Sequence, residues 1–185
     1  MTEPRIAPLT DPSPEVAELL DKTRISAGPA LNIFATLANH PRLLRRFNVL
    51  GGLFLGRGLL PARERELVIL RTGWRTRCEY EFGQHTLLGR RAGLTDEEIR
   101  RVTDESAEWP PEDAALVRLA DEITATHDVS DELWGDLSAR WNEAELLELV
   151  ALAGFYGMVS GVLNAARVRR EEETPGWPDG VSPGR

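Results

Sequence analysis

Hydrophobic residues recur at helical spacing along almost the whole middle of this chain, from about residue 14 to residue 170. Apolar side chains three and four positions apart share one face of an α-helix, and no segment shows a convincing strand pattern. Prolines at first-turn positions and a capping pair formed by Thr95 and Glu98 mark where helices begin. The pattern predicts an all-α protein with helices at 14–24, 31–39, 41–55, from 61 onward, after 95, and at 112–126, 131–140 and 143–169.

Length and composition are those of one domain with two short arms. With 185 residues, of which 42% are hydrophobic, the chain can bury one sizeable core. Residues 1–13 are rich in proline and polar side chains, and residues 171–185 carry three glutamates followed by proline and glycine. We expect a single helical domain at 14–170, a polar N-terminal arm at 1–13 and a flexible C-terminal tail at 171–185.

Charge and cysteine content argue against nucleic acid, membrane and secretion. The formal net charge is −8, and no block of Lys or Arg is long enough to form a phosphate-binding face. No apolar run reaches the ~18 residues that a membrane span requires, and the first residues lack the basic and apolar regions of a signal peptide. The single cysteine agrees, because secreted proteins of this size more often have paired cysteines. We expect a cytoplasmic protein that acts on a small molecule.

Four ionisable residues, Glu66, Cys78, Glu81 and His85, form the candidate catalytic site. Glu81 and His85 are one helical turn apart and therefore share a helix face, and Cys78 precedes His85 by seven residues on nearly the same face. Glu66 can reach them only if the chain folds back between Arg71 and Cys78, where Gly73 and Trp74 favour a bend.

These residue types suit proton transfer. Histidine has a reference pKa of ~6.5, and a neighbouring carboxylate orients its ring and favours the imidazolium. Glu66 lies in an apolar Leu-Val-Ile-Leu run, where burial raises the pKa of a carboxyl group towards neutrality. Each residue also has a structural interpretation: His85 as a core histidine satisfied by Glu81, Glu66 as an exposed partner of a nearby arginine, and Cys78 as a small buried hydrophobic residue.

Three further residues are candidates for substrate binding. Tyr80 can donate a hydrogen bond to a substrate or simply pack in the core. Arg71 can meet an anionic substrate, although arginines that flank helices are usually solvated. Trp74 lies on the apolar stripe that also contains Leu67 and Leu70. No metal site is expected, because the carboxylate, thiol and imidazole groups lack the spacing of dedicated ligands.

Three short motifs stand in this region: L-P-x-R-x-R-E-L-x-I-L-R at 60–71, C-E-Y-E-x-x-x-H at 78–85 and A-G-L-T-x-E-E-I at 92–99. They resemble those of the carboxymuconolactone decarboxylase-like superfamily, which includes the alkyl hydroperoxide reductase D-type peroxidases. The resemblance extends over roughly residues 31–170. It implies the helical bundle of that family, a homo-oligomer that is a trimer or hexamer, an apolar cavity near the subunit interface, and a mechanism without metal or cofactor.

The resemblance also suggests roles. In the peroxidase branch a proton-relay glutamate precedes a Cys-x-x-Cys pair and a histidine; Glu66, Cys78 and His85 match the glutamate, the first cysteine and the histidine, while Glu81 stands in place of the peroxide-attacking cysteine. A single cysteine cannot form a disulfide within one subunit, which favours the decarboxylase branch. We expect a lyase that uses Glu and His as acid and base on a small carboxylated or lactone-type substrate, by decarboxylation or isomerisation. The alternatives are a thiol-dependent hydroperoxidase-like reductase that uses Cys78 and a non-catalytic ligand-binding or scaffold protein.

Overall fold

Every regular element in the described part of the chain is an α-helix. The computed structural model describes residues 3–23 and 29–183, and the end of the first expected helix, at residue 24, lies outside them. The all-α prediction is confirmed within this range. The helices are α1 (Pro14–Asp21), α2 (Asn32–Leu37), α3 (Pro41–Gly56), α4 (Ala62–Arg75), α5 (Glu79–Arg91), α6 (Asp96–Arg101), α7 (Pro111–Thr126), α8 (Asp131–Ser138) and α9 (Glu143–Ala166).

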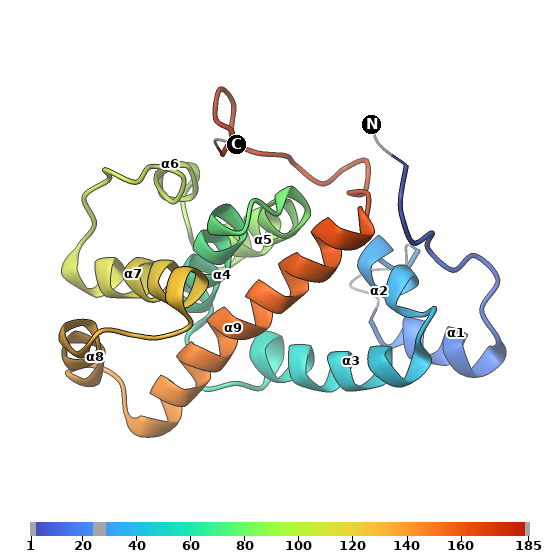
Figure 1. Cartoon of the computed structure of the whole chain (residues 1–185), viewed down its shortest axis with the longest axis horizontal. Helices are drawn as coiled ribbons and strands as arrows, with labels where there is room; N and C mark the ends of the chain where they lie inside the picture. Colours follow the sequence, from blue (N-terminus) through green and yellow to red (C-terminus); the bar gives the residue numbers. More distant parts are fainter. Residues whose placement is uncertain (1–2, 24–28, 184–185) are drawn as a thin grey trace.

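Helix α4 is the centre of the bundle. It packs against α5, α7 and α9, and its residues 66–74 are all buried. The sequence predicts one apolar stripe on this helix. In the structure it is buried on every face and contributes core contacts all round. Helices α1, α2 and α3 lie on one side of α9, and α6, α7 and α8 lie on the other (Figure 1).

A short turn folds α5 back along α4. The turn occupies residues 76–78, and Arg77 has a left-handed φ of 54°. The reversal predicted between Arg71 and Cys78 is therefore present, but it follows Arg75, because α4 continues through Gly73 and Trp74. Gly73 has a different role: a Cβ at this position would lie only 3.3 Å from the backbone nitrogen of Phe82. Its absence lets the two helices approach closely enough for side chains of α4 to meet side chains of α5.

Helix α9 is long and apolar enough, by length and composition, to cross a membrane. It has 24 residues, with a mean hydropathy of 1.8 in its most apolar window. The expectation that no apolar run reaches ~18 residues is therefore wrong for this helix. Half of that window is buried inside the protein, where α9 packs against α4 and α7. This burial is typical of the core helix of a bundle.

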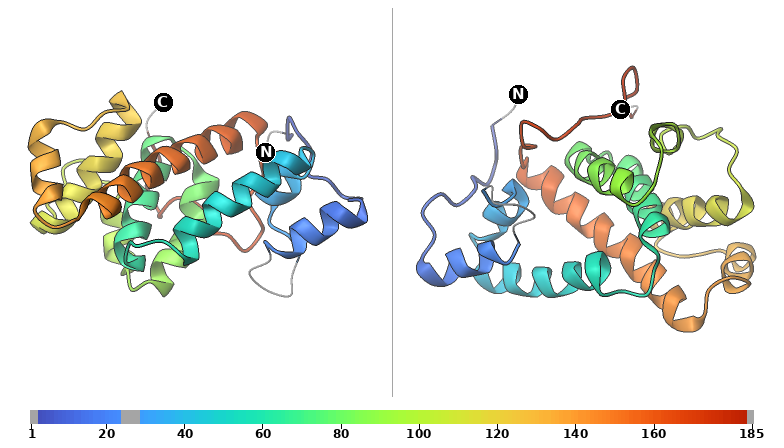
Figure 2. Two further views of the ribbon diagram at one scale, coloured as in Figure 1. Left: turned by 90° about the horizontal axis from the view of Figure 1, so that it is seen from below. Right: turned by 180° about the vertical axis from the view of Figure 1, so that it is seen from behind.

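The C-terminal segment 171–183 packs against the bundle, whereas the sequence predicts a flexible tail. It leaves the end of α9 and runs back past α5 (Figures 1 and 2). The ring centroid of Trp177 lies 4.9 Å from that of Phe82 and 5.3 Å from that of Trp74. A Cβ on Gly83 would lie 2.1 Å from a backbone oxygen of the segment, so the close packing requires glycine there.

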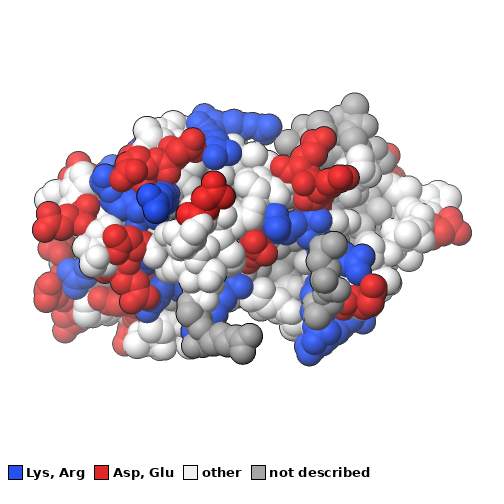
Figure 3. All heavy atoms as spheres, turned by 90° about the horizontal axis from the view of Figure 1, so that it is seen from above, with Lys and Arg blue, Asp and Glu red and all other residues white. Residues whose placement is uncertain are grey.

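Basic and acidic side chains are interspersed on the molecular face shown in Figure 3. Many charged side chains of the surface form ion pairs. Arg118, for example, pairs with Glu122 on its own helix and with Glu132 on α8. Salt-screened pairs of this kind add little stability individually. Their consequence is a surface on which positive groups adjoin negative ones.

Candidate active site

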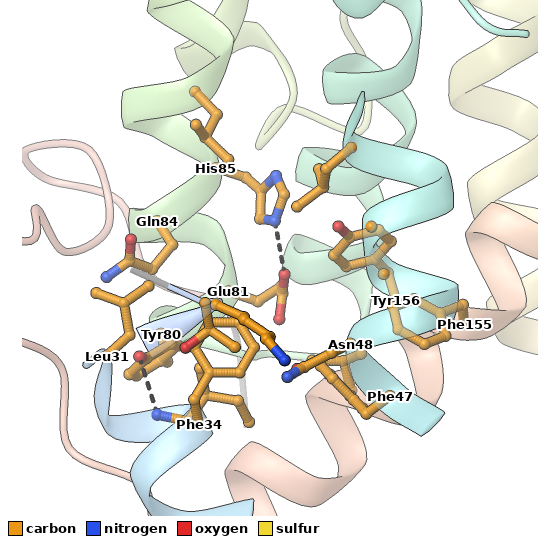
Figure 4. Close-up of a pocket in the computed structure, with 18 residues that line it drawn as sticks. Leu31, Phe34, Phe47, Asn48, Tyr80, Glu81, Gln84, His85, Phe155 and Tyr156 are labelled. Carbon is orange, nitrogen blue, oxygen red and sulfur yellow. Dashed lines mark hydrogen bonds and ion pairs between the residues drawn. The ribbon is translucent and has the colours of Figure 1, made fainter. Parts of the chain in front are cut away.

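The side chain of His85 lies between two carboxylates. Its Nδ1 is 2.6 Å from Oε2 of Glu66 on α4. Its Nε2 is 3.0 Å from Oε1 of Glu81, one turn earlier on α5, and Figure 4 shows this second contact. Both ring nitrogens donate hydrogen bonds when the ring is an imidazolium. The predicted pairing of Glu81 with His85 is present, and the α4–α5 turn adds Glu66 to it. Glu66, His85 and Glu81 together are called the relay below.

A fourth charge closes the buried end of the relay. Arg65 donates from Nε at 3.0 Å and from Nη2 at 2.9 Å to Oε1 of Glu66. The Glu66 side chain is completely buried. The alternative interpretation of Glu66, as an exposed residue paired with a nearby arginine, is therefore wrong about its exposure. The charges therefore alternate along the row, from guanidinium to carboxylate to imidazolium to carboxylate.

The alternating charges hold the relay ionised despite its burial. Burial alone would lower the pKa of His85, but the carboxylates of Glu66 and Glu81 outweigh it and raise the pKa to about 9. Burial alone would raise the pKa of Glu66. The positive charges of His85 and Arg65 outweigh this effect, so the pKa of Glu66 is lowered from the usual 4.5. The raised pKa expected for Glu66 from its apolar surroundings is thus overturned by two cations that come from its own helix and from α5.

We expect the free energy of unfolding to decrease as the pH rises from about 6.5 to about 9. The pKa of His85 is about 9 in the folded protein and 6.5 without perturbation, so its stabilising contribution is complete below pH 6.5 and is lost as the pH passes 9. The Glu66 contribution has the opposite sign and is lost only at acid pH, below its usual pKa of 4.5. The loss is at most about 3 kcal/mol.

Urea unfolding of the wild-type protein and of His85→Gln, between roughly pH 6 and pH 10, measures this effect. The stability difference between the two proteins should shrink across that interval. A difference that stays constant would mean that His85 is not the titrating group.

A cavity of about 250 Å³ lies beside the relay, between α2, α3, α5 and α9. Aromatic rings from all four of these helices contribute to its wall, and Glu81 and His85 line it, whereas Glu66 lies behind them. Figure 4 shows Glu81 and His85 on the same side of this space. The lining residues are Lys22, Thr23, Leu31, Ile33, Phe34, Phe47, Asn48, Gly51, Gly52, Leu55, Tyr80, Glu81, Gln84, His85, Leu88, Phe155, Tyr156 and Val159.

Two polar residues of the cavity are not found by sequence reasoning. The ring of Tyr156 meets the ring of His85 edge to face, with centroids 4.9 Å apart, and its hydroxyl makes no hydrogen bond to the described part of the chain. The Oδ1 atom of Asn48 on α3 is buried and likewise lacks a partner among the described residues. A signal was present for Tyr156, which places a hydroxyl in the otherwise apolar middle of α9.

Tyr80 lines the cavity, but its hydroxyl is already engaged. It donates to Oε1 of Glu171 at 2.8 Å and accepts from the backbone nitrogen of Ile33 at 3.2 Å. Burial, and then the nearby Glu171 carboxylate, raise its pKa above the usual range. The other oxygen of Glu171 accepts from Nε2 of Gln84 at 2.5 Å. Glu171, in the segment expected to be a flexible tail, therefore holds two side chains of the cavity wall.

Cys78 lies outside the cavity wall. It occupies the N-cap position of α5 and is fully buried. Burial, followed by the charge of Glu81, raises the pKa of its thiol to about 12. A thiol with this pKa is almost entirely protonated at neutral pH and is a poor nucleophile.

Arg71 and Trp74 point away from the cavity. Arg71 is buried and bonds both carboxylate oxygens of Asp121, at 2.6 and 2.8 Å, and the carbonyl oxygen of Val102 at 2.6 Å. Trp74 packs against Trp177 of the C-terminal segment. The structure thus brings the relay and Tyr80 together beside one cavity. It places Arg71 in an ion pair and Trp74 in an aromatic contact, both away from the cavity. Within the described ranges, no group of three or more His, Cys, Asp or Glu side chains is arranged to hold a metal ion.

Comparison with known proteins identifies the fold. An uncharacterized peroxidase-related protein from Ralstonia eutropha JMP134, described as an alkylhydroperoxidase AhpD core, has a TM-score of 0.79 at 22% identity over 93% of this chain and 95% of its own. A peroxidase-related protein from Silicibacter sp. TM1040 has a TM-score of 0.80 at 17% identity over 94% and 97%. The debrominase Bmp8 has a TM-score of 0.75 at 14% identity over 90% and 92%, and it has also been crystallised with 2,3,4-tribromopyrrole. No curated protein matches the chain.

At these identities the structural likeness concerns the fold and does not transfer an activity. A match at the level of sequence covers the helices that carry the relay: residues 41–122 fit the carboxymuconolactone decarboxylase family. This range contains Glu66, Cys78, Glu81 and His85. Residues 41–122 thus match the carboxymuconolactone decarboxylase family, and the chain as a whole has the AhpD-like helical fold.

Proposed function

We propose that this protein is an acid–base enzyme that moves a proton on a small lactone or related carbonyl compound. The observation that carries the proposal is the relay, which ends at the cavity in the carboxylate of Glu81, while the thiol of Cys78 lies outside the cavity wall. Glu81 is the group that takes or gives the proton, His85 stabilises its charge, and Glu66 holds His85 in place. Positioned carboxylates of this kind contribute on the order of 10²–10⁴-fold to proton-transfer rates.

Lactone isomerisation and decarboxylation both fit this arrangement. Each passes through an enolate-like species when a bond to the carbon next to a carbonyl breaks, and a nearby hydrogen-bond donor stabilises the oxygen. The cavity size also suits a small substrate, since an apolar cavity of about 150 Å³ holds benzene. The ring bound by Bmp8, a structural neighbour, is similarly small. These points support a one-ring substrate for this chain.

A lactone that enolises readily tests the proposal. We expect the wild-type protein to accelerate both deuterium incorporation into α-angelica lactone in D₂O and its isomerisation, as followed by proton NMR. The Cys78→Ala variant should retain this rate, because the thiol is buried outside the cavity.

Wild-type protein and Cys78→Ala also distinguish the acid–base proposal from the thiol-dependent alternative. Wild-type protein supplied with dithiothreitol should reduce cumene hydroperoxide no faster than Cys78→Ala does. Faster, Cys78-dependent reduction would replace the acid–base proposal with a reductase. Absence of any lactone chemistry, with binding retained, would favour the non-catalytic alternative.

We also propose that the protein is a homo-oligomer, a trimer or hexamer. Support comes from exposed apolar side chains on one face of α3, namely Val49, Leu50 and Leu53, of which Val49 is 61% exposed. Leu147 on α9 is 71% exposed. Apolar groups gathered in this way are typical of association surfaces.

Light scattering at micromolar concentration should give the mass of at least a trimer. Replacing both Val49 and Leu53 by Glu should reduce that mass, because charges would then lie in the apolar contact. A wild-type protein that is a stable monomer would contradict this assembly.

A further inference from the structure

The hydroxyl of Tyr156 is an unused hydrogen-bonding group next to the relay. Figure 4 shows it on the side of the Tyr156 ring that faces His85 and Glu81, and the two aromatic rings are in edge-to-face contact. Tyrosine hydroxyls that are buried usually have a partner. The Tyr156 hydroxyl lines the cavity and makes no hydrogen bond to the described part of the chain. It is therefore available to bond a molecule bound in the cavity.

The relay restricts what such a molecule can be. Both ring nitrogens of His85 are occupied by carboxylates, so the imidazolium has no hydrogen left to donate to a ligand. The polar group of the relay that a ligand meets is Glu81, whose Oε1 accepts from His85 while Oε2 accepts no hydrogen bond among the described residues. A ligand next to Glu81 must therefore present a hydrogen-bond donor or an acidic C–H bond.

We infer that Tyr156 is a second substrate-contacting residue, and that the site takes a neutral, single-ring compound with an enol or phenol hydroxyl, whose oxygen accepts from Tyr156 while its proton faces Glu81. The inference rests on the proposed acid–base role of Glu81. It excludes compounds whose only polar group near the relay is a carboxylate, because that group would face Glu81. The cavity lining includes Lys22, but its ammonium group is paired with Glu18.

In the reaction, Tyr156 stabilises the oxygen of the substrate. Glu81 takes a proton from the carbon beside the carbonyl; the C–H bond breaks, its electron pair forms the C=C bond, and negative charge develops on the oxygen that the Tyr156 hydroxyl contacts. Return of the proton from Glu81 to another carbon, or to the oxygen, completes a tautomerisation without oxidant or reductant. Burial, and then the charges of Glu81 and Glu66, raise the pKa of Tyr156, so it remains a donor throughout.

Asn48 offers a further polar contact on the α3 side of the cavity. Its Oδ1 is buried without a partner in the described ranges, and a buried acceptor of this kind is costly unless a bound molecule or water satisfies it. A substituted ring that reaches from Glu81 towards α3 could do so. The cavity thus has, at two places in a mostly apolar wall, polar groups that no described residue satisfies, one beside the relay and one on α3.

Three fluorinated probes of similar size test the inference by ¹⁹F NMR titration: 4-fluorophenol, 4-fluorobenzoate and fluorobenzene. Wild-type protein should bind 4-fluorophenol at least about tenfold more tightly than 4-fluorobenzoate. Tyr156→Phe keeps the ring and should weaken 4-fluorophenol about tenfold, which corresponds to one hydrogen bond, while fluorobenzene binding stays unchanged. Ser160→Ala removes a buried hydroxyl from the same helix outside the cavity wall and should change neither affinity.

The outcomes separate the two proposals. Unchanged 4-fluorophenol affinity in Tyr156→Phe, or an equal loss for fluorobenzene, would overturn the hydrogen-bonding role. Benzoate binding as tight as phenol binding would overturn the preference for neutral compounds. If the Tyr156-dependent preference for 4-fluorophenol holds but wild-type protein leaves α-angelica lactone unchanged, ligand recognition is supported and the acid–base function fails.

Discussion

Replacing His85 by glutamine should lower the turnover of α-angelica lactone by ~10²-fold or more while the helical fold stays intact. Glutamine can still hydrogen-bond but cannot carry the positive charge that lies between Glu66 and Glu81. Glu66→Gln should have a similar effect, because His85 then loses the carboxylate that holds its Nδ1 and keeps the ring charged. Initial rates by NMR, with circular dichroism at 222 nm for the fold, measure both expectations.

Glu64→Gln is the matched control, since it removes a carboxylate from the same helix that pairs with Arg140 away from the cavity. It should retain wild-type turnover. If the variants at Glu66 and His85 also retain it, the relay is structural. If both unfold, the two residues are core partners, and the less disruptive Glu81→Gln decides the question: a lost rate with an intact fold would still assign proton transfer to the relay, and a retained rate would refute it.

Replacing Gly83 by alanine should destabilise the protein by about 2 kcal/mol, within the range found for overpacked sites. The new methyl group would lie 2.1 Å from the carbonyl oxygen of Pro175 and 2.8 Å from the side chain of Thr174, so the C-terminal segment has to move. Such a movement takes Trp177 off Phe82. Tryptophan emission should shift to longer wavelength, and endoproteinase Glu-C, which cleaves after glutamate, should cut the glutamates at 171–173 faster than in the wild-type protein.

Gly135→Ala gives the opposite result and serves as the control. Gly135 is an exposed residue of α8, and no atom lies within 4 Å of the position that its Cβ would occupy. Alanine is a better helix former than glycine, so this variant should be more stable by about 0.5–1 kcal/mol. Equal urea midpoints for Gly83→Ala and the wild-type protein would show that the segment does not pack as described.

Local patterns predicted the helices and, within the relay, the pair formed by Glu81 and His85. Thr95 and Glu98 form the capping box expected at the start of α6. Glu81 and His85 meet across one turn as their spacing requires, because the geometry of a helix determines the distance between such residues. The position of Glu66 required only that the chain reverse between the two helices. These features depend on neighbours in sequence, where propensity and periodicity are informative.

The remaining features depend on contacts between distant parts of the chain. Glu171 reaches Tyr80 across 91 positions, and no periodicity in a segment rich in Pro and Gly signals that contact. The partner of Arg71, Asp121, is 50 positions away, so the sequence could not show that the guanidinium is already paired. Tyr156 approaches His85 only through the packing of α9 beside α5. The catalytic and binding roles themselves stay predictions until the variants are measured.

The burial of Cys78 has a consequence for the conditions under which the protein works. Its thiol is fully buried and keeps its proton at physiological pH, so peroxides and alkylating agents meet neither an accessible nor an activated thiol. Carboxylates and imidazole are not consumed by such oxidants at comparable rates. If the acid–base proposal holds, the protein requires no thioredoxin or glutathione to restore it after each cycle, and its activity persists through oxidative stress that inactivates thiol enzymes.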